Sequence, residues 1–318
     1  MMEYRNVNGK YKTNLYGKNM EGLNMSREFT IENEYLKLTV TTWGAQVKSV
    51  LRKCDNVEHI WQADKSVWGY HAPILFPHCG KLVDGKLEAK GKVYESSQHG
   101  FARLMEHDFV DQTDDTIVLE LCSSEETLAK FPFEFRLVST FTLEGDTVHH
   151  TLTVENLDTD KLPFGIGYHP AFTVPFDDAH TATDYELRFN EVESPICINN
   201  LPHGLMHGNI YLMPANIQTI PIDEYLFAND SHCMVNLKST KLGVYEKGTG
   251  RGVVCDISEF PYTLLWSKPG MPQFVCIEPW HSLPSPEGGS IRWEEKAAAA
   301  VLNPGEAWSC TLSTSFVR

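Results

Sequence analysis

The chain has 318 residues, of which 42% are hydrophobic and 22% charged, a composition typical of a globular protein with a substantial buried core. Its 27 Lys and Arg against 42 Asp and Glu give a formal net charge of −15, which disfavours binding to nucleic acid or to an anionic membrane. No apolar run approaches the roughly 20 residues of a membrane-spanning helix. We therefore expect a protein with neither of these partners.

Residues 1–25 differ from the rest of the chain, since they carry four basic and two acidic residues and few aliphatic ones. They also lack the apolar centre of a secretion signal. We expect a mobile N-terminal extension here and a single domain over residues 26–318. The eight cysteines lie far apart and form no C-x-x-C pair, so we expect reduced thiols in a cytoplasmic protein.

Alternating apolar and polar residues predict β-strands along most of the chain, beginning with Leu36 to Val40. A helix is expected only at 123–130, which begins with the capping-box pattern Ser123-x-x-Glu126. Two alternating runs, 133–143 and 148–154, flank a Gly-Asp turn and predict a hairpin. Further strands are expected at 116–122, 184–190, 233–238, 252–257, 262–267, 273–278 and 307–316. This spacing favours an all-β sandwich or barrel.

Three segments contain residues suited to chemistry. His99 and Arg103 lie on either side of Gly100, His169 lies in an apolar Gly-Tyr-His-Pro-Ala-Phe segment, and Glu278 ends the apolar run Phe-Val-Cys-Ile before Pro-Trp. A surface loop and a core histidine are the more common explanations of the first two segments. A glutamate at the end of an apolar strand is harder to explain, because a buried carboxylate without a partner is costly.

Together these residues could supply an acid, a base and an orienting group around a small polar molecule. Trp280, Trp266 and Phe101 could offer flat apolar faces, which match the C–H faces of a sugar. The sequence therefore favours a carbohydrate as the small-molecule partner.

No residue pattern calls for a cofactor or a metal. His203 and His207 have the i, i+4 spacing of paired ligands, but Pro202 and Gly204 disfavour the helix that this spacing requires. Dinucleotide, phosphate-loop and nucleophile-elbow motifs are absent from the sequence. We expect neither metal nor cofactor.

The chain resembles the galactose mutarotase-like proteins, or aldose 1-epimerase family. The resemblance is carried by His-Gly-Phe-Ala-Arg at 99–103, Gly-Tyr-His-Pro-Ala-Phe at 167–172 and Glu-Pro-Trp at 278–280. Supporting segments are Pro-Ile-Leu-Phe-Pro at 73–77, Gly-Lys-Leu at 80–82, Phe-Pro-Tyr at 260–262 and Leu-Trp at 265–266. The resemblance implies a large antiparallel β-sandwich, often called a supersandwich, with a sugar cleft on one concave sheet.

The same resemblance implies an isomerase that interconverts the α and β anomers of an aldose by ring opening without a cofactor. Carried over, Glu278 is the base that takes the proton of the anomeric hydroxyl and His169 is the acid that donates to the ring oxygen. His99 is a second histidine near the ring oxygen. The acid must be protonated near neutral pH, and we expect the carboxylate of Glu278 to raise the pKa of His169.

Sugar-binding residues are expected around these three. They are Arg103, Trp280, Phe101, Lys81 at a position where the family usually has arginine, and Asp223, with Asp230 as a rival for the binding aspartate. Lysine keeps the charge of arginine but lacks its two-pronged contact, which leaves the identity of the sugar open.

Alternative functions remain open at this stage. A hexose 6-phosphate 1-epimerase would use Lys81 and Arg103 as phosphate contacts, and a non-catalytic carbohydrate-binding protein could keep the same fold. A glycoside hydrolase would need a second carboxylate about 5–9 Å from Glu278, for which Asp223 is the nearest choice. The protein could be a monomer or a homodimer, in which a second copy covers exposed sheet edges.

Overall fold

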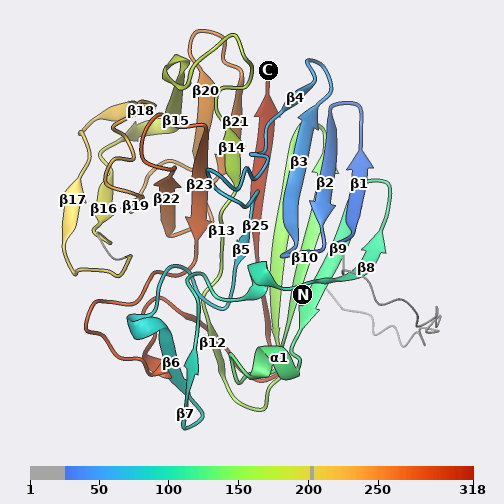
Figure 1. Ribbon diagram of the computed structural model, residues 1–318, viewed down its shortest axis with the longest axis vertical. Helices are drawn as coiled ribbons and strands as arrows, with labels where there is room; N and C mark the ends of the chain where they lie inside the picture. Colours follow the sequence, from blue (N-terminus) through green and yellow to red (C-terminus); the bar gives the residue numbers. More distant parts are fainter. Residues whose placement is uncertain (1–25, 201–203) are drawn as a thin grey trace, which may run out of the picture.

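The computed structural model describes residues 26–200 and 204–318. The predicted extension at 1–25 and His203 lie outside the described residues. Within the described part nearly all regular structure is antiparallel β-sheet, which confirms the predicted all-β sandwich (Figure 1). None of the helices in the described ranges is long and apolar enough to cross a membrane.

The larger of two main sheets has nine strands. In spatial order they are β18 (Ile217–Pro221), β15 (Tyr185–Glu193), β20 (Lys241–Glu246), β21 (Gly252–Asp256), β25 (Ala307–Val317), β11 (Thr147–Asn156), β10 (Phe135–Glu144), β9 (Thr116–Cys122) and β8 (Asp108–Gln112). Strands distant in sequence are thus neighbours, because β25 at the C-terminus pairs with β11.

The second main sheet has eight strands and carries the candidate site. Its order is β17 (Ile210–Leu212), β16 (Ile196–Ile198), β19 (His232–Val235), β22 (Tyr262–Trp266), β23 (Phe274–Trp280), β13 (Gly167–Tyr168) and β5 (Ile74–Leu75), with β14 (Ala171–Thr173) also pairing with β23. All seven residues of β23 are buried, because both of its faces are covered.

Smaller elements complete the fold. They are the four-stranded sheet β1 (Glu28–Glu32), β2 (Leu36–Thr41), β3 (Gln46–Arg52) and β4 (Val57–Glu58), the pair β6 (Lys86–Ala89) and β7 (Lys92–Glu95), and the pair β12 (Leu162–Phe164) and β24 (Ala300–Leu302). The helices are α1 (Glu125–Leu128) and the 3₁₀ turns Val83–Gly85, Ala102–Leu104, Ala182–Asp184 and Trp293–Glu295. Figure 1 shows the β1–β4 sheet alongside β8 to β10, and residues of both contribute to one core.

The predicted hairpin is confirmed as β10 and β11, joined at Gly145 and Asp146. Buried and half-exposed residues alternate along both strands, as period two requires. Phe141 and Leu152 on the inner face are fully buried, and each such side chain stabilises the fold by about 1.5–3 kcal/mol. The hydrophobic pattern therefore fixes which face of this hairpin meets the core.

The predicted helix is shorter than expected and capped differently. Ser124, not Ser123, is the N-cap, and its hydroxyl accepts the Thr127 amide while Thr127 completes the capping box in place of Glu126. Threonine can make this reciprocal bond because its hydroxyl reaches the N-cap amide. A capping box was predicted correctly, but it begins one residue later than expected.

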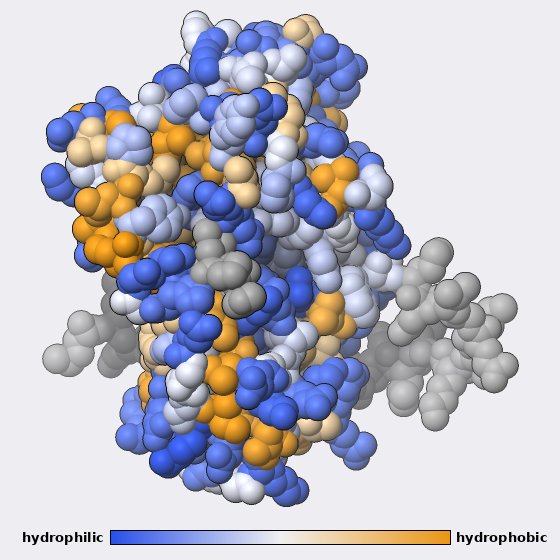
Figure 2. Space-filling model, turned by 60° about the vertical axis from the view of Figure 1, so that its left-hand side comes forward, coloured by the Kyte–Doolittle hydropathy of each residue, from blue (hydrophilic) through white to orange (hydrophobic). Residues whose placement is uncertain are grey.

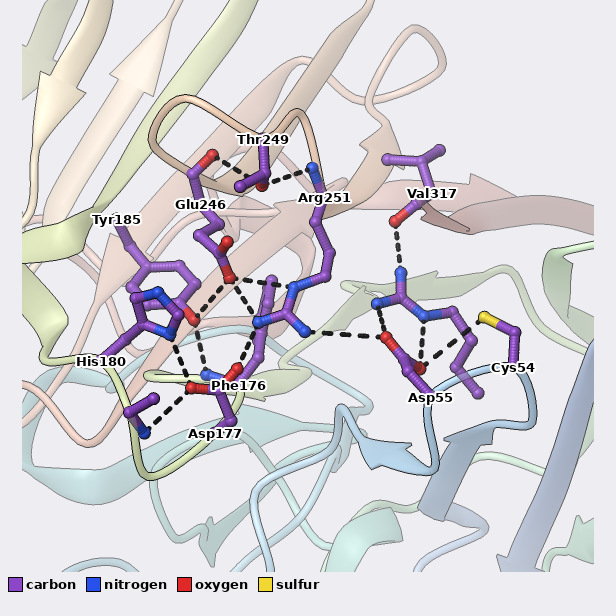
Figure 3. A network of polar contacts seen from close by, with 12 residues as sticks. Cys54, Asp55, Phe176, Asp177, His180, Tyr185, Glu246, Thr249, Arg251 and Val317 are labelled. Carbon is purple, nitrogen blue, oxygen red and sulfur yellow. Dashed lines mark hydrogen bonds and ion pairs between the residues drawn. The ribbon is translucent and has the colours of Figure 1, made fainter.

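A network of ion pairs around Arg251 joins three distant segments (Figure 3). The guanidinium lies between the carboxylates of Asp177, Glu246 and Asp55, and Asp55 also pairs with Arg52. Figure 3 shows these side chains pointing toward one another from the β20–β21 turn, the loop after β14 and the turn after β3. The network thus connects the nine-stranded sheet to the four-stranded sheet.

Hydrophilic residues dominate the surface turned forward in Figure 2. Hydrophobic patches also appear on this face, and the exposed apolar side chains of the protein include Ile210 and Leu212 of β17. β17 is the edge of the eight-stranded sheet. The site described next lies nearer the middle of that sheet, at β22 and β23.

Candidate functional site

A cavity of about 320 Å³ opens on one face of the eight-stranded sheet. This volume is at the lower end of the ~300–1,000 Å³ of small-molecule sites. Glu278, His169 and His99 line it together, although they are far apart in the chain. Arg103 and Trp280 also line it, so five of the predicted site residues meet in one place.

Glu278 is held on the cavity side of β23 by the alternation of that strand. Cys276, Glu278 and Trp280 point to one face, while Val275 and Ile277 belong to the main core on the other. Glu278 pairs in register with Leu264 of β22 and is only 2% exposed. A carboxyl group with so little access to water needs a polar partner close by.

That partner is His169, in the loop between β13 and β14. Its Nε2 lies 3.3 Å from Oε2 of Glu278. The His169 amide donates to the carbonyl of Pro73, and Trp68 stacks on the imidazole with ring centroids 4.9 Å apart. Trp266 meets the same ring edge-on at 5.6 Å. Two indoles therefore fix the imidazole plane and keep water away from it.

Burial controls the protonation of this pair. Loss of hydration lowers the pKa of His169 to about 3, with the positive charge of Arg103 as a further cause. Loss of hydration also raises the pKa of Glu278 well above its usual value, and the charge of Asp230 adds to this. The expectation that Glu278 raises the pKa of His169 is wrong, because desolvation disfavours the charged form of both groups. Near neutral pH the pair therefore holds one proton.

His99 is held in a fixed tautomer. Its backbone has φ 68°, and its amide donates to the Gly80 carbonyl while the Gly80 amide donates to Nδ1 at 3.0 Å. Nδ1 is thus an acceptor, which leaves the proton of the neutral ring on Nε2. Burial lowers the pKa of His99 well below its usual value, so the ring stays neutral. Its Nε2 lies 3.2 Å from the side-chain amide nitrogen of Gln98, and its ring centroid lies 5.5 Å from that of His169.

The expected binding residues Arg103 and Trp280 are anchored at the cavity wall. The guanidinium of Arg103 lies over the Tyr70 ring at 4.8 Å and donates to the Gln98 carbonyl, while its buried Nε has no hydrogen-bond partner. The indole nitrogen of Trp280 donates to the Tyr168 carbonyl. Arg103 therefore retains a donor for a ligand, and Trp280 offers only its apolar face.

Three other expected binding residues lie away from the cavity lining. Phe101 is 5% exposed and packs in the core against Phe76 and Phe135, so it cannot face a sugar. Asp223 caps its own turn, where Oδ1 accepts the amides of Tyr225 and Leu226. Lys81 is exposed and lies at the rim beside Gly204 rather than in the lining. The interpretation of Phe101 as a sugar platform is corrected by its burial.

Of the two rival aspartates, Asp230 lines the cavity. It follows the short turn at Phe227, whose carbonyl accepts the Asp230 amide, and it adopts a positive φ of 73°. Its charge reaches Glu278 strongly enough to raise the pKa of that carboxyl. Asp230 thus takes the place at the cavity that the sequence analysis gave first to Asp223.

Sequence reasoning missed Trp68, Asn200 and Lys268, which also line the cavity. Trp68 is positioned by Trp61, whose indole nitrogen donates to the Trp68 carbonyl. Asn200 is 7% exposed, and its Oδ1 has no hydrogen-bond partner. No motif surrounds Asn200 or Lys268, and only the Trp61–Trp68 pair gave a signal, as tryptophans close together in an otherwise polar segment.

Comparison with known proteins agrees with this geometry. A sequence model of the family described as "Aldose 1-epimerase" matches residues 27–314. The plasmid-encoded protein LacX of Lactococcus lactis subsp. lactis is 31% identical over 288 residues, which cover 86% of this chain and 94% of LacX.

Two crystal structures are also similar. A galactose mutarotase related enzyme from Lactobacillus acidophilus has a TM-score of 0.87 at 27% identity, covering 92% of this chain and 98% of its own. A galactose mutarotase-like protein from Lactobacillus casei has a TM-score of 0.83 at 30% identity, covering 91% and 99%. The match over nearly the whole chain, together with the shared fold, shows that this protein belongs to the aldose 1-epimerase family.

Proposed function

We propose that this protein interconverts the α and β anomers of an aldose by acid and base catalysis of ring opening. The observation that carries this proposal is the convergence of Glu278, His169 and His99 on one cavity. Family membership supports a sugar as the substrate. Asp230, Asn200 and Arg103 add polar groups that can bind sugar hydroxyls.

In the proposed first step, Glu278 removes the proton of the anomeric hydroxyl while protonated His169 donates to the ring oxygen. The C1–O5 bond breaks, the C1 carbonyl forms, and the two protein groups are left uncharged. Rotation about C1–C2 presents the other face of the carbonyl. Return of both protons closes the ring as the opposite anomer, so protons and electrons balance over the cycle.

The single proton of the pair suits this step. Burial favours its position on Glu278, whereas the step begins with it on His169, and the 3.3 Å contact between the two groups allows this transfer. An anomeric hydroxyl that donates to Glu278 stabilises the carboxylate form. Ring opening then removes the two buried charges, which favours the open form of the sugar in the site.

His99 has a supporting role in this mechanism. Its neutral Nε2–H can donate to the ring oxygen region, where negative charge develops as the C1–O5 bond breaks. The Gly80 amide fixes the tautomer, and the sugar would take the place of the Gln98 side-chain amide at Nε2. His99 thereby orients the sugar and stabilises the transition state.

Glu278→Gln tests the proposal. Polarimetry on freshly dissolved α-glucose and α-galactose should show a ~10²- to 10⁴-fold loss of catalysed mutarotation, the usual contribution of one acid or base. Sugar binding, followed by tryptophan fluorescence, should persist, since glutamine keeps the shape of the side chain. Glu224→Gln, at an exposed glutamate, is the matched control and should retain full activity.

The outcomes separate the alternatives. Native protein that binds sugars without accelerating mutarotation would be a carbohydrate-binding protein. The same assay with glucose 6-phosphate tests the phosphorylated substrate, which two cations at the cavity, Arg103 and Lys268, make a specific second candidate. Hydrolysis of an aryl glycoside would instead indicate a glycoside hydrolase with Asp230 as its second carboxylate.

A further inference from the structure

A third polar group lies beside the His169–Glu278 pair. Cys276 precedes Glu278 by two residues on β23 and points to the same face. One ligand atom from each of His169, Cys276 and Glu278 lies within 4.8 Å of the other two, and all three residues are buried. The mechanism proposed above makes no use of the thiol.

These three side chains form a donor set of the kind that zinc prefers. Zinc binds imidazole nitrogen, thiolate and carboxylate at about 2.0–2.3 Å, which places neighbouring ligand atoms of a tetrahedral site ~3.3–3.8 Å apart. Nε2 of His169 and Oε2 of Glu278 already lie 3.3 Å apart, and the Cys276 sulfur lies within 4.8 Å of a ligand atom of each. Thiolate favours zinc or cadmium over magnesium and calcium.

The charges also balance. A thiolate and a carboxylate with a neutral imidazole carry two negative charges, which a divalent cation neutralises. A divalent cation held by these three groups would therefore leave no net charge in the buried site.

Access to the cluster is from the sugar cavity. His169 and Glu278 line that cavity, whereas Cys276 lies beneath it and packs near Trp68 and Trp266. An ion held by the three residues would have its fourth coordination position toward the cavity. It would also occupy the atoms that the proposed reaction uses for proton transfer.

We propose that His169, Cys276 and Glu278 form an inhibitory site for a thiophilic divalent cation such as Zn²⁺. Binding of the ion and binding of a sugar exclude each other. The inhibitory half of this proposal rests on the proposed mutarotase function, while the binding half does not.

A second cluster in the described residues, Asp177, His180 and Glu246, also brings three metal-binding groups within reach of one another. There the guanidinium of Arg251 already lies between the two carboxylates. The positive charge of Arg251 thus takes the place that a metal ion would occupy, and we propose no metal site there.

The test measures metal binding and activity separately. Equilibrium dialysis with Zn²⁺, and the thiolate-to-metal charge-transfer band of bound Co²⁺, should show one ion per chain. Cys276→Ala should weaken Zn²⁺ binding by more than ~100-fold, since even an outer-shell partner contributes 10- to 100-fold. Mutarotation by this variant should persist and become insensitive to zinc.

Cys233→Ala is the matched control. Cys233 is a buried cysteine of β19 that packs near Trp280 and lies outside the cluster, so zinc binding and inhibition should stay as in the native protein. Native protein without the charge-transfer band, or Cys276→Ala protein that binds zinc as tightly as native, would overturn the proposal. Zinc binding through Cys276 in a protein without mutarotase activity would uphold the site and refute the proposed function instead.

Discussion

Protonation of the Glu278–His169 pair depends on the groups that cover it rather than on the pairing alone. From the sequence, a neighbouring carboxylate was expected to raise the pKa of the imidazole. The structure adds Trp68 and Trp266 around the ring, and the resulting loss of hydration lowers that pKa to about 3. The sequence identified the two partners, but the solvent exclusion comes from segments that no motif connected to them.

The pH profile of kcat/KM should reflect the pair as a unit. Below about pH 3 the pair takes up a second proton, on His169. At high pH the pair loses its shared proton from Glu278. Activity should therefore fall at low and at high pH. Between about pH 4 and 7 kcat/KM should vary less than about threefold. Polarimetry corrected for the spontaneous reaction measures this, and a loss of activity centred near pH 6.5, the ordinary histidine pKa, would contradict the shared proton.

The two rival aspartates can be separated by a pair of amide substitutions. Asp230→Asn removes a charge at the cavity and should lower kcat/KM about 10-fold, the value of one charge-assisted hydrogen bond. Asp223→Asn should leave kinetics unchanged and cost at most ~1 kcal/mol of stability, because Asp223 only caps a turn. Steady-state kinetics and urea unfolding give both values. Equal kinetic losses in the two variants would refute the assignment of Asp230 to the site.

At the scale of elements, the loop that carries His99 depends on a tight backbone approach. Gly100 has φ +72°, and a Cβ built there would lie 2.2 Å from the Phe76 carbonyl oxygen. His99 itself is bonded to Gly80 through its amide and its ring. Gly100 is thus a position where the chain has no room for a side chain.

Gly100→Ala should therefore displace His99, lower kcat and reduce the free energy of unfolding by about 2–4 kcal/mol. Gly91→Ala is the control, since Gly91 in the β6–β7 turn has φ +74° but no atom within 4 Å of the position that a Cβ would take. It should cost about 1–2 kcal/mol and leave kcat unchanged. Thermal unfolding and kcat at saturating sugar distinguish the two effects, and an active Gly100→Ala protein would show that the loop tolerates the shift.

Long strands were predictable and short ones were not. The hairpin of β10 and β11 was expected to within two residues at each strand end, because ten alternating positions and a Gly-Asp turn give a clear pattern. β5, β13 and β14 have two or three residues each, too few to show a period, yet they place His169 beside β23. The elements that position the site are therefore those that local pattern reveals least.

For the whole molecule, the all-β fold class could be predicted from the sequence. The meeting of the site residues in one cavity could not be predicted from local sequence patterns. His169 and Glu278 meet because β13 pairs with β23, although the two strands are far apart in the chain, and His99 is tied to Gly80 in the loop after β5. The resemblance to the family supplied that convergence. Asn200 and Lys268 follow β16 and β22, and the pairing of the strands brings them to the cavity. The sequence alone therefore could not identify them as cavity residues.

The Arg251 network joins sheets that do not share strands, so its loss should affect the stability of the whole fold (Figure 3). Arg251→Met should lower the free energy of unfolding by about 2–4 kcal/mol near neutral pH. The change leaves Asp177, Glu246 and Asp55 without their shared cation, and Glu246 is only 4% exposed.

The cost should shrink in acid. Arg251 and His180 lower the pKa of Asp177 to about 2, so this carboxylate contributes stability above its ordinary pKa near 3.8, and that contribution is lost as pH falls through about 2. Urea unfolding at about pH 7 and pH 3 should therefore show a smaller gap between native and Arg251→Met protein at the lower pH. Arg136→Met is the control, because Arg136 pairs with Glu120 and Glu155 in a more exposed position and should cost less than ~1 kcal/mol. Equal costs for the two arginines, or a gap that does not narrow in acid, would show that the network does not hold the sheets together.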